Sequence, residues 1–170
     1  MKKILAVVLS VYLALILFMP KEQILWTAIN KADPNLKVTV EQTSDYGIFQ
    51  DVNTIKISYD SMPLVNIDNI KVFPFLFYNL ATISTVEPSS SLKSMLNIVV
   101  LKSSVTNFVL NPMMLKINAD TTIGEVEGSF DLSTSKLKIF LTPNKEFNSF
   151  KYKSYLKKQK GGYSYESIIR

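Results

Sequence analysis

Residues 53–72, NTIKISYDSMPLVNIDNIKV, decide the fold class of this chain. In their first half Ile55 and Ile57 alternate with polar residues, which is the period of a strand with one buried face. The Asp-Ser pair at positions 60–61 marks a turn, and Leu64–Val72 follows as a second apolar run. Two such runs around a short turn predict an antiparallel hairpin, and therefore a β protein.

Similar runs lie on both sides of this hairpin. Glu87–Ser94, which is rich in serine, predicts a loop. About eight to ten strands without βαβ alternation predict a mainly β fold: a curved antiparallel sheet, groove or incomplete barrel, with an N-terminal transmembrane helix and one or two short helices. The further predicted strands are Leu36–Glu41, Ile48–Phe49 (a short strand or bulge), Phe75–Val86, Met95–Leu101, Val105–Leu110, Met114–Ala119, Thr121–Leu132, Lys136–Thr142 and a closing strand from Tyr163.

The N-terminal segment Ile4–Met19 contains no charged residue and follows Lys2 and Lys3. As a helix it would be roughly 24 Å long, enough to span a locally thinned bilayer with snorkelling lysines. The same features are typical of a cleaved signal peptide, but no small-x-small cleavage pattern closes the segment, which favours an uncleaved signal anchor. We therefore predict a membrane anchor in residues 1–20, with its lysines cytoplasmic, and an exported β domain in residues 21–170.

Composition limits the chemistry that the chain can perform. It has no cysteine and no histidine, which excludes a disulfide scaffold and histidine-dependent catalysis and leaves no usual zinc ligand. Two carboxylate pairs, Asp45 with Asp51 and Glu125 with Glu127, are interpreted as surface charge rather than as acid–base or Ca²⁺ sites. We predict that the chain is not an enzyme and binds no cofactor. Its net charge of +5 is interpreted mainly as a solvated surface.

Two apolar features before residue 81 are candidate contacts with lipid or a partner. Residues 21–33 predict a short amphipathic helix, in which Trp26 would lie in the headgroup belt or plug one end of the β domain. Residues 72–80, VFPFLFYNL, are the most aromatic stretch. Continuous apolarity fits burial on both faces or one face against lipid or a partner, and core packing is favoured. The candidate contacts in this stretch are Phe73, Phe75, Phe77 and Tyr78.

The C-terminal part predicts a basic amphipathic helix over Glu146–Gln159, ended by Gly161-Gly162. Phe147 and Phe150 would face inward. The basic residues could hold lipid phosphates or an acidic partner, although a solvated helix face is the preferred interpretation. The lysines singled out as possible contacts are Lys151, Lys153, Lys157 and Lys158.

The order of these features resembles a known family. An N-terminal anchor, the segment KEQILWTAINKA, the run IKISYDSMPLVNIDNIKVFPFLFYNL and the ending GSFDLSTSKLKIFLTP with GGYSYE are similar to the type II secretion system protein N family, which is itself similar to AsmA-like proteins. The resemblance covers most of residues 20–170. It implies a single-pass protein of the bacterial inner membrane, with a cytoplasmic N-terminus and a periplasmic β domain.

Two functions follow as expectations. The first is an accessory or assembly component of a secretion or envelope-biogenesis system, which acts by docking envelope or secretion-system proteins. The alternative is a lipid-binding or lipid-transfer module with an apolar β groove, AsmA-like or similar to the LptC-type subunit of lipopolysaccharide transport. The sequence leaves open whether the strands enclose a groove or a packed core. Nucleic acid is not expected as a partner.

Overall fold

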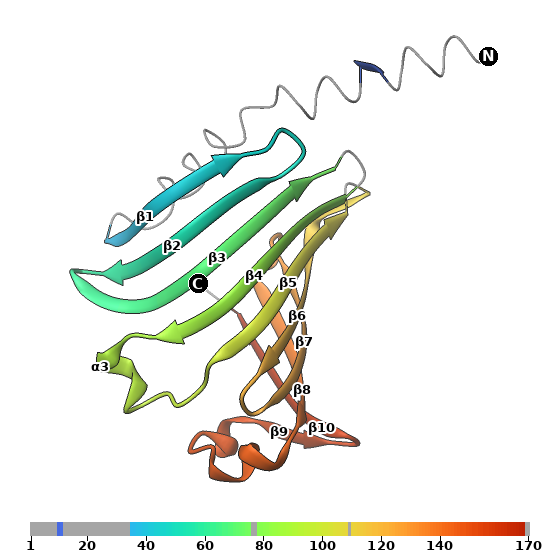
Figure 1. Cartoon of the computed structure of the whole chain (residues 1–170). Helices are drawn as coiled ribbons and strands as arrows, with labels where there is room; N and C mark the ends of the chain where they lie inside the picture. Colours follow the sequence, from blue (N-terminus) through green and yellow to red (C-terminus); the bar gives the residue numbers. More distant parts are fainter. Residues whose placement is uncertain (1–9, 12–34, 76–77, 109, 169–170) are drawn as a thin grey trace.

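The computed structural model describes residues 10–11, 35–75, 78–108 and 110–168 (Figure 1). The predicted anchor, the predicted helix over residues 21–33, Trp26 and Phe77 lie outside these residues. Within the described part, no helix combines the length and the hydropathy needed to cross a bilayer.

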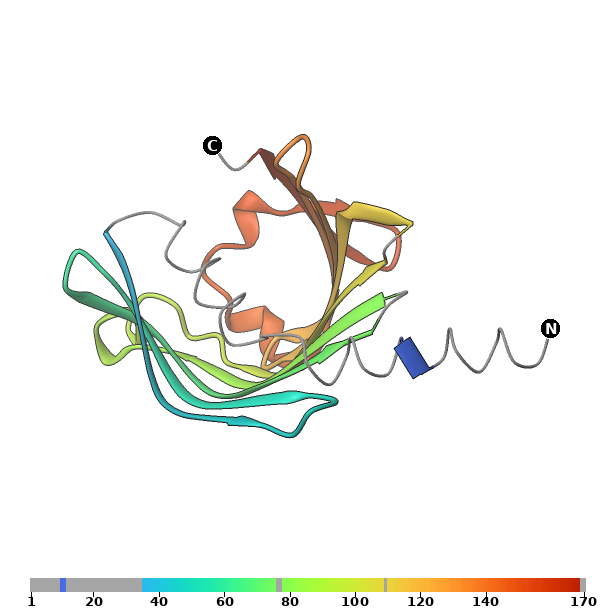
Figure 2. The ribbon, with the colours of Figure 1, turned by 90° about the horizontal axis from the view of Figure 1, so that it is seen from above.

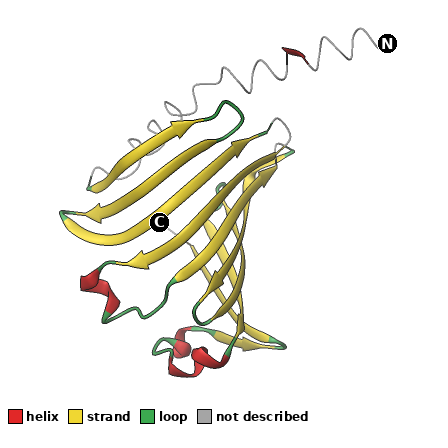
Figure 3. Ribbon diagram, viewed as in Figure 1, coloured by secondary structure: helices red, strands yellow, loops and turns green. Residues whose placement is uncertain are grey.

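Ten strands form one sheet, and Figure 3 shows that strands dominate the chain. The described fold is therefore mainly β, and its sheet is antiparallel, as predicted. The number of strands agrees with the expected range. The strands are β1 (Leu36–Asp45), β2 (Gln50–Tyr59), β3 (Met62–Pro74), β4 (Tyr78–Pro88), β5 (Val100–Phe108), β6 (Asn111–Thr121), β7 (Gly124–Asp131), β8 (Lys136–Pro143), β9 (Lys157–Gln159) and β10 (Gly162–Ile168).

The sheet is a meander up to β8, because each strand pairs with its neighbour in sequence. β10 then pairs with β8, and the short β9 pairs with the outer side of β10. The order leaves β1 and β9 at the two edges of the described sheet. Seen from above, the sheet curls into an open trough and does not close into a barrel (Figure 2).

A fault in the strand alternation runs across the first part of the sheet. Thr54 in β2 and Thr85 in β4 have positive φ angles of 52° and 30°. Across this fault, two successive inward residues of a strand are three positions apart instead of two. Both residues still pack in one cluster, as Val52 and Ile55 do. An extra outward residue in neighbouring strands bends a sheet, which accounts for part of the curl.

The strand register identifies the concave face. Phe147 contacts the cluster that contains Leu141 and Tyr163, and its segment lies inside the curl in Figure 2. Partners across strands share a face of a sheet, so the row that contains Leu141 faces the concave side. From β1 to β10 this row is Thr43, Val52, Ile70, Ile83, Ser103, Ala119, Val126, Leu141 and Tyr163.

Several predicted boundaries are wrong. Met95–Leu101 and Val105–Leu110 are not two strands, because Lys102–Ser104 lies inside the single strand β5 and residues 95–99 form a loop. Ser103 is a polar residue at an inward position, and this hid the strand from a pattern of alternating hydrophobicity. Ile48–Phe49 belongs to the β1–β2 connection, and the predicted loop Glu87–Ser94 contains the short helix α3 (Ser90–Lys93).

The predicted C-terminal helix over Glu146–Gln159 is also wrong. The segment forms two 3₁₀ turns, η1 (Lys145–Ser149) and η2 (Lys153–Tyr155), followed by β9. Asn144 caps η1 by accepting a hydrogen bond from the Glu146 N–H at 2.9 Å. The chain turns extended at Phe150, where ψ is 119°. Asparagine, serine and aromatic residues are weak helix formers, and here tertiary packing of the rings replaces a regular helix.

Candidate functional site

The concave face of the sheet presents an apolar surface. Its first part is built on three buried residues, Val52, Ile55 and Ile67, with half-buried side chains around them. The half-buried neighbours come from β1 to β4 and are Val38, Val40, Ile57, Val65, Ile70, Ile83 and Val86. The apolar lining continues on β5 to β8 through Val105, Ile117 and Ile139, which are also only half-buried.

The C-terminal turns close one end of the trough. Phe147 is buried with Ile123 and Leu141, and its ring lies 4.5 Å from the ring of Tyr163 between centroids. The Phe150 ring packs at a tilt against the Phe147 ring, with 5.9 Å between centroids. These aromatic rings fill the concave side beside the β6–β7 connection, so a packed plug lies at this end.

Gln50 is the most deeply buried polar side chain that the structure describes. It is 1% exposed and lies on β2 two residues from Val52, so it faces the concave side. Its Nε2 atom has no hydrogen-bond partner. An unpaired buried donor costs about 1–3 kcal/mol, and this amide is such a donor within an apolar surface.

An aromatic row crosses the convex side at the opposite end from the plug. It joins the β1–β2 connection, the end of β3, the start of β4 and the end of β5. Successive ring centroids are 4.7, 5.2, 6.3, 5.0 and 6.2 Å apart, distances at which aromatic pairs attract. The row consists of Tyr46, Phe49, Phe73, Phe75, Tyr78 and Phe108.

Three of the aromatic residues singled out from the sequence, Phe73, Phe75 and Tyr78, therefore lie together in this row. They are not the buried core favoured for residues 72–80, since Phe73 and Phe75 are half-buried and Tyr78 is exposed. The sequence missed Tyr46, Phe49 and Phe108. All three are aromatic residues in or beside a connection that leads from an odd-numbered strand to the next strand. The sequence does not show that these connections meet at one end of the sheet, because this follows from the meander.

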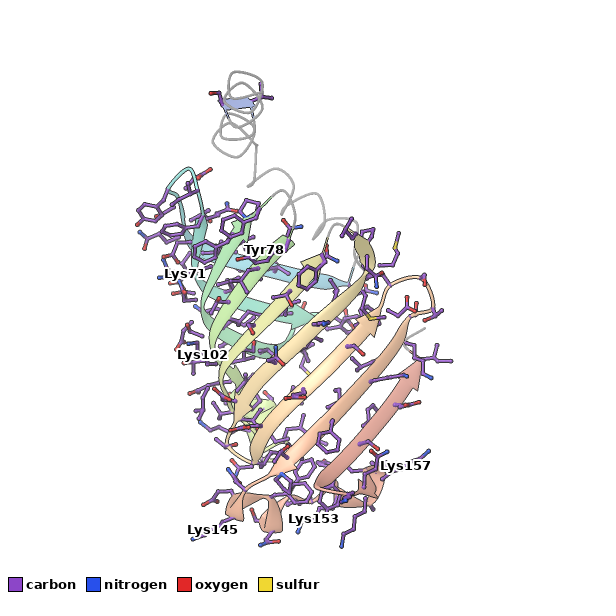
Figure 4. All side chains as sticks on the ribbon, turned by 90° about the vertical axis from the view of Figure 1, so that its right-hand side faces the viewer. Lys71, Tyr78, Lys102, Lys145, Lys153 and Lys157 are labelled. Atoms are coloured by element: carbon purple, nitrogen blue, oxygen red, sulfur yellow. The ribbon has the colours of Figure 1, made fainter. Side chains whose placement is uncertain are left out.

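The candidate lysines lie at the plugged end, where Figure 4 labels Lys153 and Lys157. Lys153 donates to the Asn148 carbonyl, and its Nζ lies 5.4 Å from the centroid of the Phe147 ring, so this lysine helps to hold the plug. Lys157 and Lys158 are exposed on the edge strand β9. Lys151 lines a small cleft of about 270 Å³ together with Lys93 and Tyr152. The structure does not gather the four lysines on one helix face.

The two carboxylate pairs do not form sites. Asp51 accepts a hydrogen bond from Asn69 and pairs with Lys71 at 3.8 Å, whereas Asp45 accepts from the Gly47 N–H at 2.7 Å. Glu125 and Glu127 are exposed on β7. In the described residues, no three carboxylates gather as a metal site would require.

Comparisons of the chain with protein-family models, with curated proteins and with solved structures found no match. The resemblance to the type II secretion system protein N family therefore stays a prediction.

Proposed function

We propose that this chain is a membrane-anchored module that binds an acyl chain of a lipid in the trough of its β sheet. The observation that carries the proposal is the concave face: an apolar lining from eight strands, in a sheet that curls without closing, with most of its side chains only half-buried. Exposed apolar surface of this extent favours an apolar occupant. The predicted anchor in residues 1–20 would hold the trough beside its lipid source.

The chemistry of the lining supports an acyl chain over a polar ligand. Side chains such as Ile83, Ile117 and Ile139 offer dispersion contacts and no charge, and burying each methylene of a ligand against them contributes about 0.8 kcal/mol. Gln50 is a polar side chain on this face, as are Thr43 and Ser103, and its unpaired amide donor could bind one ester carbonyl of a lipid.

Docking of envelope or secretion-system proteins is the second candidate. It is supported by the two sheet edges, β1 and β9, which pair with no further strand in the described sheet. An unpaired edge offers backbone N–H and C=O groups to a partner strand. We propose it as an additional role because the edges lie outside the trough.

The proposal is tested by blocking the trough. The full chain is placed in phospholipid nanodiscs that contain a phospholipid with a photoactivatable acyl chain, and cross-linked peptides are mapped by mass spectrometry. Ala119→Trp places an indole on the concave face of β6, whereas Asn118→Trp places the same group one residue away on the convex face. We expect cross-linking to β5–β8 peptides in the wild type and in Asn118→Trp, and at least a fivefold loss in Ala119→Trp.

Cross-links confined to the N-terminal 34 residues, or equal labelling of β5–β8 in both variants, would refute lipid binding in the trough. Circular dichroism melting of both variants checks that each is folded. If Ala119→Trp does not fold, Ile117→Asn makes the same test by adding a polar amide to the lining, and the same loss is expected.

A further inference from the structure

Four connections at one end of the sheet, together with their flanks, carry apolar side chains, most of which are exposed. The meander places the connections β1–β2, β3–β4, β5–β6 and β7–β8 at the same end. We name as the apolar rim six residues of these connections and their flanks: Tyr46, Ile48, Phe75, Tyr78, Leu110 and Leu132. Leu110 is 97% exposed and Tyr46 is 60% exposed. Burial inside this domain explains neither side chain.

The apolar rim is poor in charge. The described residues of the four connections include no lysine or arginine. The two carboxylates that flank them, Asp45 and Asp131, accept hydrogen bonds from their own turns. Hydrogen bonds from Ser133 and Thr134 lower the pKa of Asp131, with the Ser133 side chain contributing most. Both carboxylates therefore serve the local turn geometry.

Three lysines lie on the strands that lead to the rim, farther from the tips than the rim residues. Lys71 is near the end of β3, Lys116 lies over the Phe108 ring at 5.8 Å, and Lys136 begins β8. Figure 4 shows Lys71 toward the same end of the molecule as Tyr78, with Lys145, Lys153 and Lys157 at the far end. From the tips inward, the order is the aliphatic side chains Ile48, Leu110 and Leu132, then the tyrosine and phenylalanine rings with Asp45 and Asp131 near their level, then lysine.

We infer that the apolar rim is a membrane-contact edge, which lies against a phospholipid bilayer with its tips below the phosphate level. The order of groups matches the order of layers in a bilayer, since apolar tips meet the acyl region, aromatic rings favour the glycerol region and lysines meet anionic phosphates. This inference stands without the proposed lipid trough.

Site-directed labelling of the full chain tests the inference, because the chain has no cysteine. The variants Leu110→Cys and Leu132→Cys place an environment-sensitive nitrobenzoxadiazole label on the rim. Met62→Cys and Tyr155→Cys are the controls, because these residues are 56% and 70% exposed at the opposite end. Each labelled chain is reconstituted into vesicles of phosphatidylethanolamine and phosphatidylglycerol, with or without a lipid that carries a nitroxide on its acyl chain.

We expect the lipid-borne nitroxide to quench the rim labels at least threefold more than the control labels, and aqueous iodide to show the reverse order. Rim labels as open to iodide as the controls would overturn the inference. Rim labels protected from both quenchers would also overturn it and would indicate a protein contact. No readout here depends on cross-linking inside the trough. The experiment can therefore refute membrane contact by the rim while lipid binding in the trough stands, and the cross-linking experiment can refute lipid binding while membrane contact stands.

Discussion

At the scale of single residues, Thr54 and Thr85 are the least expected features of the sheet. Both have positive φ, a conformation that is costly for a β-branched residue. They lie in one row across the sheet, with Asp68 of β3 between them, and this row is the fault that shifts the inward positions by one residue. The curl of the sheet is therefore supported by local backbone strain in at least two strands.

Replacement of Thr54 by glycine tests this strain. Glycine adopts positive φ without the penalty of about 1–2 kcal/mol that an L side chain meets, but loses about 0.5–1 kcal/mol through its greater freedom when unfolded. We expect Thr54→Gly to leave the free energy of unfolding unchanged within about 0.5 kcal/mol, or to raise it. Urea unfolding of the full chain in mild detergent measures this quantity.

Thr82→Gly is the matched control, because Thr82 lies on β4 with ordinary φ. It is expected to lower the free energy of unfolding by about 1 kcal/mol, the usual cost of glycine within a strand. Equal losses in the two variants would mean that Thr54 stores no strain.

Residue-scale features divide clearly by their predictability. The alternation of Ile55 and Ile57 predicted the central hairpin, because a strand with one buried face imposes that period. The shift at Thr54 could not be predicted, because it depends on neighbouring strands bending together. The burial of Gln50 carries no sequence signal either, since a glutamine flanked by Phe49 and Asp51 is typical of a turn or a surface.

At the scale of elements, the segment between β8 and β10 departs most from its prediction. Its spacing of Phe147 and Phe150 correctly indicated which side chains pack inward, but not how the backbone would achieve it. The 3₁₀ turns and β9 satisfy the same contacts with an irregular chain. Helical periodicity over so few residues fits more than one backbone, and the tilted contact of the Phe147 ring with the Tyr163 ring favours the irregular one.

Two adjacent glycines in this element have different roles. Gly161 has a φ of 88° and open space around it, in the turn between β9 and β10. A Cβ on Gly162 would clash with the Leu141 carbonyl oxygen. We expect Gly161→Ala to lower the free energy of unfolding by about 1 kcal/mol through backbone strain, and Gly162→Ala to lower it by about 3 kcal/mol through overpacking.

Hydrogen exchange of the β8 and β10 amides separates the two effects. Gly162→Ala should speed exchange across the β8–β10 pairing, because the strands must move apart, while Gly161→Ala should alter only the turn. An equal effect of the two substitutions would contradict the close approach of Gly162 to β8.

At the scale of the whole molecule, the apolar interior is divided into two clusters. One is built on Val52, Ile55 and Ile67, and the other on Ile123, Leu141 and Phe147. Between them the concave row carries the small residues Ser103 and Ala119. The fold class was predictable because a meander needs only local patterns, whereas this division was not, because it arises from the curl.

Two truncations test whether the clusters unfold separately. Ile55→Ala and Phe147→Ala each remove a buried side chain, and each is expected to cost about 3 kcal/mol. We expect Ile55→Ala to reduce amide protection mainly in β1–β4, and Phe147→Ala mainly in β7, β8 and β10, because parts of a protein can open independently. Hydrogen-exchange mass spectrometry of the full chain measures both patterns. A uniform loss of protection in either variant would indicate one cooperative unit.

The meander also bears on how a protein of this form could change its size. Because every strand from β1 to β8 pairs with its neighbour in sequence, a duplicated hairpin could be inserted at either side of β5 and every other register would be kept. Two inserted strands would widen the curled sheet by roughly 9–10 Å across the strands. They would also add one more turn to the same rim. Gene duplication within the chain could thus change the capacity of the trough stepwise, hairpin by hairpin, without rebuilding its plug.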